Sequence, residues 1–288
     1  MRNINVSCLI YQIRHYLREM VMVSSLTPGG ALLFVPGNRP DRFNKAAACM
    51  PDHVIVDLED AVSPDEKAPA REHARRWLRS APAIVRVNEA GSPWHDDDLQ
   101  MASRSAAGVV LPKAESSEVV QSVVGRCDVP VFALIESPQG VLEASRIARA
   151  GVAGLMFGNV DFAAEAGVQH SSHMALLMAR STLVYASAAA GISAPVDGVT
   201  TQIDAPDVLA ADLQHAREVG FAGRLCIHPG QVSPTQAAFL PTEAELTWAA
   251  AVLRAGDGVS VVSGEMVDPP VLTRARSILA RGRKGSGR

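Results

Sequence analysis

Eight short apolar runs recur along the chain, and this repetition limits its possible folds more than any other feature. Each run has the length of a strand and leads through polar residues into a stretch with the 3.6-residue period of an amphipathic helix. Strands that alternate with crossover helices form parallel sheets, and eight such units close into a (β/α)8 TIM barrel. The sequence therefore predicts an α/β protein of this type, with its functional groups at the carboxyl ends of the strands. The runs are Ala31–Val35, His53–Asp57, Ile84–Asn88, Gly108–Leu111, Val131–Ile135, Gly154–Phe157, Ala194–Asp197 and Arg224–Ile227.

The overall composition is that of an ordinary globular protein. The chain has 288 residues, of which 48% are hydrophobic and 20% are charged, and its net charge is −3. This charge provides no basic excess for a nucleic acid or an anionic membrane, so we expect neither partner. The cysteines form no C-x-x-C pair, which argues against a zinc knuckle or a disulfide framework and favours a cytoplasmic location. They are Cys8, Cys49, Cys127 and Cys226.

The first segment, residues 1–27, does not match the repeating pattern. It mixes apolar residues with charges such as Arg14 and Glu19, so it contains neither an uninterrupted membrane span nor a signal-peptide core. We interpret it as a leader. The open alternatives are a disordered stretch, a peripheral helix, and a wrongly assigned start, with the true one at Met20 or Met22.

The remaining chain divides into a barrel and a tail. Residues 28–241 are predicted to form the catalytic barrel domain, and residues 242–288 are predicted to form a C-terminal helix and lid segment. Within the tail, the helix is expected over Glu243–Ala255, followed by a Gly-rich linker over residues 256–264. Such a tail lies outside the eight repeating units and can reach away from its own barrel.

Two carboxylates follow neighbouring strands of the predicted barrel. Glu136 follows Val131–Ile135 and Asp161 follows Gly154–Phe157, a spacing of one βα unit. Because parallel strands end at the same edge, the two acids are expected to meet there, and paired carboxylates suit Mg²⁺. The alternative is that Glu136 caps a helix beginning near Pro138 while Asp161 caps a turn.

Polar residues close the other strands as well. Arg86 is notable because it stands inside a strand between Val85 and Val87, where a surface ion pair is an unusual use of arginine. One polar strand end would be a turn residue, but a full set of acids and bases indicates a funnel of functional groups. The set comprises Pro36, Gly37, Asn38, Arg39, Asp57, Glu59, Asp60, Arg86, Asn88, Pro112, Lys113, Asp197, His228 and Pro229.

These motifs resemble, in order, those of the HpcH/HpaI aldolase and citrate lyase β-subunit family, in its CitE-like branch. The resemblance extends from about Ala31 to the end of the chain. It rests on LLFVPGNRPDRFNKA, VIVDLEDAVSPDEKAPAR, VRVNEAGSPWHDDDL, GVVLPKAES, ALIESPQG, GNVDFAAEAG, APVDGVTTQIDAPD and GRLCIHPGQV.

The resemblance implies a Mg²⁺-dependent TIM-barrel lyase, with Mn²⁺ as a substitute metal. Members of the family cleave β-hydroxyacyl thioesters such as citryl-CoA, malyl-CoA and citramalyl-CoA. Similarity assigns the metal to Glu136 and Asp161 and the substrate carboxylate to Arg86. It also implies a homo-oligomer, a trimer or a multiple of one, in which Asp268 covers a neighbouring subunit's site and donates a proton. Asp268 precedes two prolines, so a solvated turn acid is the alternative.

The remaining site residues are assigned by their chemistry. Glu59 and Asp60 are expected to bind the metal's waters and to position Arg86 or Lys113. A coenzyme A thioester is implied by the resemblance alone, and the loops Pro36–Arg39 and Ile227–Gly230 are the candidate walls for it. The binding residues are then Pro36, Asn38, Arg39, Ile227, His228 and Pro229.

Two other activities fit the same residues. One is a CoA-thioester hydrolase that uses the same metal and enolate chemistry. The other is a citrate lyase β subunit that acts on thioesters of an acyl carrier protein. The sequence alone does not choose between these and the free acyl-CoA lyase.

Overall fold

The computed structural model describes residues 29–255, 260–262 and 265–285, so the predicted leader, residues 1–27, lies outside the described part. The chain separates into two compact units, one that ends at Thr235 and one that begins at Gln236. Within the described residues, no helix is long and apolar enough to cross a membrane.

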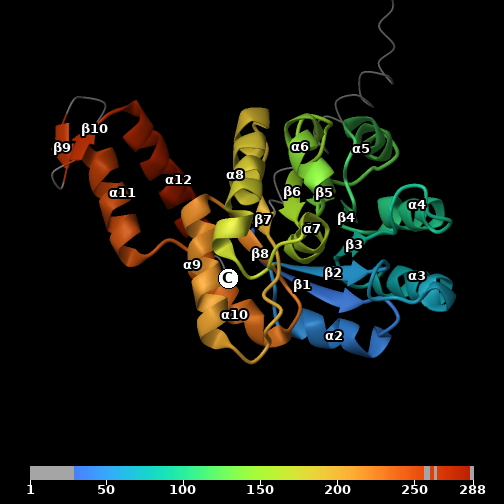
Figure 1. Ribbon diagram of the computed structural model, residues 1–288. Coiled ribbons are helices and arrows are strands. Elements are labelled where there is room, and N and C mark those ends of the chain that lie inside the picture. Colours follow the sequence, from blue (N-terminus) through green and yellow to red (C-terminus); the bar gives the residue numbers. More distant parts are fainter. Residues whose placement is uncertain (1–28, 256–259, 263–264, 286–288) are drawn as a thin grey trace, which may run out of the picture. The chain divides into compact units, whose positions relative to one another are not determined.

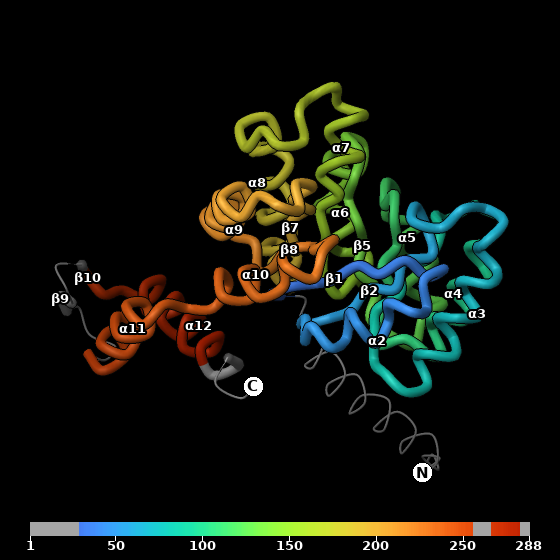
Figure 2. Tube along the Cα trace, turned by 90° about the horizontal axis from the view of Figure 1, so that it is seen from below, coloured from blue at the N-terminus to red at the C-terminus, as the bar shows by residue number. Residues whose placement is uncertain are grey.

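The first unit is a closed barrel of eight parallel strands, which confirms the predicted fold (Figure 1). Neighbours in the barrel are neighbours in the sequence, and the first strand pairs with the last, so the barrel has no free edge. Figure 2 shows these two strands, β1 and β8, side by side when the molecule is viewed from below. The strands are β1 (Gly30–Pro36), β2 (His53–Asp57), β3 (Ile84–Arg86), β4 (Gly108–Leu111), β5 (Val131–Ile135), β6 (Gly154–Phe157), β7 (Val196–Asp197) and β8 (Gly223–Cys226).

Helices connect the strands, and their starting points follow local sequence signals. Ser116, Ser137 and Ser172 each cap a helix by accepting a backbone N–H from three residues further on. Prolines occupy the first turn of α2, α6 and α9, where a missing N–H costs nothing. The helices are α2 (Pro40–Ala48), α3 (Lys67–Trp77), α4 (His95–Ser105), α5 (Ser117–Val124), α6 (Pro138–Ile147), α7 (Asn159–Ala166), α8 (His173–Ala190), α9 (Pro206–Val219) and α10 (Val232–Phe239), with short 3-10 turns η1 (Pro64–Glu66) and η2 (Pro229–Gln231).

Some strands end earlier than the apolar pattern predicts, because side chains take over backbone hydrogen bonds. Asn88 was expected within β3, but its N–H donates to the carboxylate of Asp98 at 3.1 Å. Ile227 was expected within β8, but its N–H donates to the amide oxygen of Gln231 at 3.0 Å. Pro195, which has no N–H, precedes the short strand β7.

Large apolar side chains fill the interior of the barrel. They come from all eight strands, so the interior is a packed core and not a pore. Phe34 and Val199 pack against this core and also line a cavity, which makes the apolar core the floor of that cavity. The core residues are Leu32, Ile55, Ile84, Val110, Phe132, Leu134, Met156, Val196 and Leu225.

The second unit has a hydrophobic core of its own. Helix α11 (Glu243–Ala255) has the predicted bounds, and it packs with α12 (Pro269–Gly285). An antiparallel pair, β9 (Ser260–Val262) and β10 (Glu265–Val267), lies between the two helices in the chain. The sequence predicted a linker over residues 256–264, but β9 lies within that range because its run of valines favours a strand.

Candidate functional site

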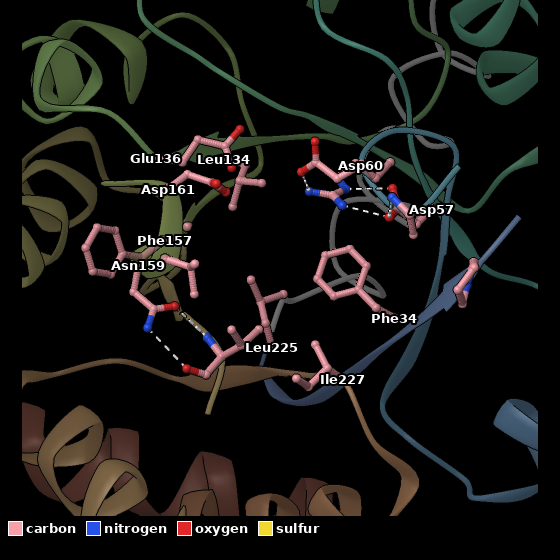
Figure 3. A pocket seen from close by; sticks show the side chains of 16 residues that line it. Phe34, Asp57, Asp60, Leu134, Glu136, Phe157, Asn159, Asp161, Leu225 and Ile227 are labelled. Carbon is pink, nitrogen blue, oxygen red and sulfur yellow. Dashed lines mark hydrogen bonds and ion pairs between the residues drawn. The ribbon is translucent and has the colours of Figure 1, made fainter. Parts of the chain in front are cut away.

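A cavity opens among the polar residues that follow the barrel strands (Figure 3). Its volume is about 390 Å³, and both apolar and charged side chains line it. Figure 3 shows Glu136 and Asp161 next to each other, while Asp57 and Asp60 lie farther along the rim. The lining residues are Phe34, Pro36, Asp57, Asp60, Ala61, Arg86, Leu134, Glu136, Phe157, Gly158, Asn159, Val160, Asp161, Val199, Leu225 and Ile227.

Glu136 directly follows β5, and only one of its two carboxylate oxygens accepts a hydrogen bond. One carboxylate oxygen, Oε1, accepts the backbone N–H of Lys113 at 2.7 Å. The other, Oε2, is buried and has no hydrogen-bond partner. A Cβ at Gly158 would overlap the side chain of Glu136, so only glycine allows this approach. Ser137 caps α6, so the alternative role of Glu136 as a helix cap is wrong.

Asp161 approaches Glu136 from a helix. Strand β6 ends at Phe157 and α7 begins at Asn159, which places Asp161 in the first turn of α7. The sequence predicted an acid at a strand end. The structure instead positions this carboxylate at a helix N-terminus that lines the cavity, where the macrodipole favours a negative charge.

Burial and repulsion make this group of acids hold protons unusually tightly. Burial raises the pKa of Glu136 to about 8, and the charges of Glu59 and Asp161 add to this effect. Burial also raises the pKa of Asp161, with a contribution from Asp60. A cation placed between Glu136 and Asp161 would relieve this repulsion and give the unpartnered Glu136 oxygen a ligand.

The donor set suits one kind of metal. Among the described residues, no group of three or more His, Cys, Asp and Glu side chains could hold an ion. A zinc site with three or four protein ligands therefore does not fit. Mg²⁺ commonly takes one or two carboxylates and completes its octahedron with water and substrate, so Glu136 and Asp161 fit Mg²⁺.

Arg86 is fixed by acids from the end of β2 and from the loop that follows it. Its Nε and Nη2 each donate to one oxygen of Asp57 at 2.7 Å, a bidentate arrangement that sets the plane of the guanidinium. The Nη1 group lies 3.0 Å from Glu59 and 3.3 Å from Asp60. The ring of Phe34 lies under the guanidinium, 5.0 Å from its centre. Burial alone would lower the pKa of Arg86, but these acids raise it, so the group stays charged.

Glu59 and Asp60, which the sequence predicted to position Arg86 or Lys113, both contact Arg86, and Lys113 extends the network through Glu59. Lys113 Nζ lies 3.1 Å from Glu89 and 3.6 Å from Glu59. The backbone of Lys113 has a positive φ of 48°, an uncommon conformation for a residue other than glycine. It directs the Lys113 N–H to Glu136, so this residue serves the site through its backbone as well as its ammonium group.

The residues proposed as walls for coenzyme A occupy different positions. Pro36 and Ile227 line the cavity. Asn38 donates to Glu66 at 2.7 Å, and Arg39 forms an exposed ion pair with Asp41 at 3.0 Å. The last two, His228 and Pro229, begin the turn η2, where His228 Nδ1 accepts the Gly230 N–H at 3.2 Å.

Two strand-end residues of the predicted funnel have structural roles instead. Asp197 is fully buried between Arg180, at 2.9 Å, and Arg224. Asn88 donates to Asp98 and to the Leu58 carbonyl. The sequence grouped them with the site because a polar strand end has the same appearance whether its side chain points into the cavity or into the protein.

Sequence reasoning missed several residues of the cavity wall. Four of them are apolar, and nothing in an apolar run shows which of its side chains will line the cavity. They are Phe34, Leu134, Phe157 and Leu225. Asn159 was passed over although it directly follows a strand and a glycine, a position that could have identified it. Its buried amide joins the first turn of α7 to the loop after β7.

A family model described as HpcH/HpaI aldolase/citrate lyase matches residues 31–229. The chain belongs to this family. That match covers all eight barrel strands except the first residue of β1, including every residue that lines the cavity.

Similar proteins bear two different activity names. A citrate lyase subunit beta-like protein of Deinococcus radiodurans is 37% identical over 87% of this chain and 96% of its own length. A (3S)-malyl-CoA thioesterase of Cereibacter sphaeroides is 34% identical over 90% of this chain and 96% of its own length. The solved CitE of Mycobacterium tuberculosis, in complex with magnesium, acetoacetate and coenzyme A, is also similar. It is 34% identical, with a TM-score of 0.77, and the match covers 90% of this chain and 100% of that one.

Asp268 belongs to the second unit. Its side chain is exposed, and its carboxylate accepts the Val271 N–H at 3.1 Å, so it caps α12. This is a structural role of the kind expected for an acid before a proline. Its action at the active site of a neighbouring subunit remains a prediction.

Proposed function

We propose that the protein is a Mg²⁺-dependent carbon–carbon lyase that cleaves a β-hydroxyacyl-CoA into a 2-keto acid and a shorter acyl-CoA. The observation that carries this proposal is the pairing of Glu136 and Asp161 at the cavity, with one buried Glu136 oxygen left without a partner. The magnesium and coenzyme A of the similar CitE structure support the choice of metal and thioester. Citramalyl-CoA, malyl-CoA and citryl-CoA are the candidate substrates.

Glu136 and Asp161 would hold the metal, and Lys113 and Gly158 fix the first of them. When bound, Mg²⁺ would act as a Lewis acid that lowers the cost of negative charge on the substrate hydroxyl and its neighbouring carboxylate.

The protein's own groups would handle the other charges of the reaction. Loss of the hydroxyl proton breaks the carbon–carbon bond and leaves the electron pair on the thioester as an enolate, which must then gain a proton. Arg86 stays charged and faces the cavity, so it can bind the substrate carboxylate and stabilise this charge. Glu59 holds its proton up to near neutral pH, which suits a group that exchanges protons in this network.

A thioester hydrolase is the second candidate, because a relative of similar identity is named a malyl-CoA thioesterase. Hydrolysis and cleavage would both use Glu136 and Asp161 to hold the metal that binds the hydroxyacyl-CoA. A subunit acting on carrier-protein thioesters is the third, because another relative is named citrate lyase subunit beta-like.

The test is a product analysis with purified protein, Mg²⁺ and a panel of hydroxyacyl thioesters. The lyase proposal predicts a 2-keto acid and a shorter acyl-CoA in equal amounts. Free coenzyme A and an intact hydroxy acid would instead identify a hydrolase, and activity restricted to carrier-protein thioesters would identify a citrate lyase subunit. The variant Glu136→Gln is the control, because it removes a metal ligand while keeping the side chain's size.

We further propose that Pro36 and Ile227 border the entry of the coenzyme A chain, with Asn38, Arg39, His228 and Pro229 outside the cavity as its outer contacts. Arg39 would have to leave Asp41 to bind a phosphate, and this exchange costs little because the pair is exposed. An Arg39→Ala variant should raise KM for the CoA thioester with little change in kcat.

A further inference from the structure

We propose that Asn159 is a positioning residue for the metal site, and that it acts by clamping the first turn of α7 to the loop after β7. This inference rests on the proposed function, since it concerns the carboxylate Asp161 of the same site. Asn159 precedes Asp161 by two residues, and both line the cavity (Figure 3).

The clamp consists of two hydrogen bonds made by one buried amide. The side-chain oxygen of Asn159 accepts the backbone N–H of Val199 at 2.8 Å, and its NH₂ group donates to the carbonyl of the same residue at 3.1 Å. The Asn159 side chain therefore pairs with Val199 as a neighbouring strand would. With 2% exposure, it is shielded from water that could replace these bonds.

The loop on the other side of the clamp is itself firmly held. The carbonyl of Thr200 accepts the Gln231 side-chain N–H at 2.9 Å, and the Thr200 hydroxyl donates to Asp212 at 2.6 Å. Asp212 also accepts from Arg224 at 2.9 Å, which ties it to strand β8. Val199 is thus a fixed point on the barrel frame.

Helix α7, by contrast, has few other anchors. Of its eight residues only Asn159 and Ala163 are buried, so its first turn has little apolar packing to hold it. The contact between Phe162 and Phe157, with ring centres 5.5 Å apart, fixes the helix one residue beyond Asp161. The clamp therefore provides the main polar restraint on the turn that carries Asp161.

Two glycines make this close junction possible. A Cβ at Gly198 would overlap the amide of Asn159, and a Cβ at Gly158 would overlap Glu136. The strand end with Glu136, the helix turn with Asp161 and the loop with Val199 therefore meet only because both positions lack a side chain. A side chain at Gly198 would disturb the clamp alone, whereas one at Gly158 would displace the metal ligand Glu136 directly.

The test compares direct Mg²⁺ binding by titration calorimetry in the wild type, Asn159→Leu and Gly198→Ala. Asn159→Leu keeps the side-chain volume but removes both hydrogen bonds, and Gly198→Ala displaces the amide without removing any polar group. We expect each to raise the Kd for Mg²⁺ by roughly 10- to 100-fold, the usual effect of losing a group that orients a metal ligand. If Asn159→Leu does not fold, Gly198→Ala decides the question.

A control on the same helix separates positioning from general destabilisation. Gly167 ends α7 with a φ of 69° and has open space around it, so Gly167→Ala strains the helix without reaching the site. We expect this variant to lower the melting temperature yet bind Mg²⁺ as the wild type does. Normal Mg²⁺ affinity in both clamp variants, or an equal loss in Gly167→Ala, would overturn the inference and leave the proposed function intact. A wild type that does not bind Mg²⁺ would overturn both.

Discussion

Arg86 is fixed in its plane by Asp57, so its capacity for stabilising charge depends on the shape of the guanidinium as well as on its charge. Replacement with lysine keeps the charge but removes the two parallel bonds to Asp57. We expect Arg86→Lys to lower kcat by about 10² to 10³, the usual cost of losing one preorganised donor to a developing negative charge. The measurement is steady-state kinetics, with Arg75→Lys in a solvent-accessible ion pair as the matched control. Equal kcat in both variants would remove Arg86 from the reaction.

Glu59 should make the metal-free protein less stable as the pH rises. Burial, opposed by Arg86 and assisted by Asp60, raises its pKa from 4.5 to about 7. The folded protein therefore binds the proton more tightly than the unfolded chain does, so stability is lost between those two pH values. We expect Glu59→Gln to remove up to about 3 kcal/mol of this pH dependence, because glutamine does not titrate. Urea unfolding of the wild type and of Glu59→Gln at about pH 5 and pH 8, without Mg²⁺, measures this change in the free energy of unfolding. The same change in both proteins would contradict the raised pKa of Glu59.

At the scale of elements, α8, β7 and β8 are joined by charges and not by apolar packing alone. Burial by itself would raise the pKa of Asp197, but Arg224 and Arg180 hold it below its ordinary value, so the group stays ionised. Both arginines are at most 2% exposed. Asp197 therefore compensates the charges of two buried arginines and joins the three elements that carry these residues.

Neutralising the central acid should therefore weaken the whole unit. Asp197→Asn leaves Arg180 and Arg224 buried with less compensating charge, and we expect it to lower the free energy of unfolding by about 3–5 kcal/mol. The solvent-accessible pair of Glu72 with Arg75 is the control, since Glu72→Gln should cost far less than Asp197→Asn. Urea denaturation followed by circular dichroism compares the two, and equal losses would show that the buried network contributes no more than a surface pair.

The strands were predictable because apolar runs followed by polar residues determine both where a strand lies and which end is functional. The predicted strand ends were wrong where a side chain, and not a neighbouring strand, accepts the backbone N–H. Asp98 accepts the N–H of Asn88, and Gln231 accepts that of Ile227. Such bonds join a backbone N–H to a side chain that follows it in a turn or helix, so the apolar periodicity does not reveal them. For the same reason the sequence brought Glu136 and Asp161 together but missed the amide of Asn159, whose partner is backbone.

At the scale of the whole molecule, the sequence predicted a barrel and a C-terminal helix, and both are present. The role of the tail is different in kind, because it concerns a second copy of the chain. The apolar periodicity of a sequence indicates how residues pack within one chain. It does not indicate whether a segment contacts a neighbouring subunit. Only the family resemblance suggested that Asp268 serves another subunit.

We expect a homo-oligomer, a trimer or a multiple of one, in which Asp268 acts on a neighbouring site. The substitution must remove the acid without breaking α12, which Asp268 caps. Asp268→Asn meets this need, because asparagine caps helices as well as aspartate does, whereas alanine would cost about 1 kcal/mol. Asp268→Asn alone and Glu136→Gln alone should each be nearly inactive. When the two chains are unfolded, mixed and refolded together, a fraction of the sites receives an intact Glu136 from one chain and an intact Asp268 from the other, so activity should return. Native mass spectrometry verifies the mixed oligomers, and mixed oligomers without activity would show that Asp268 does not act between subunits.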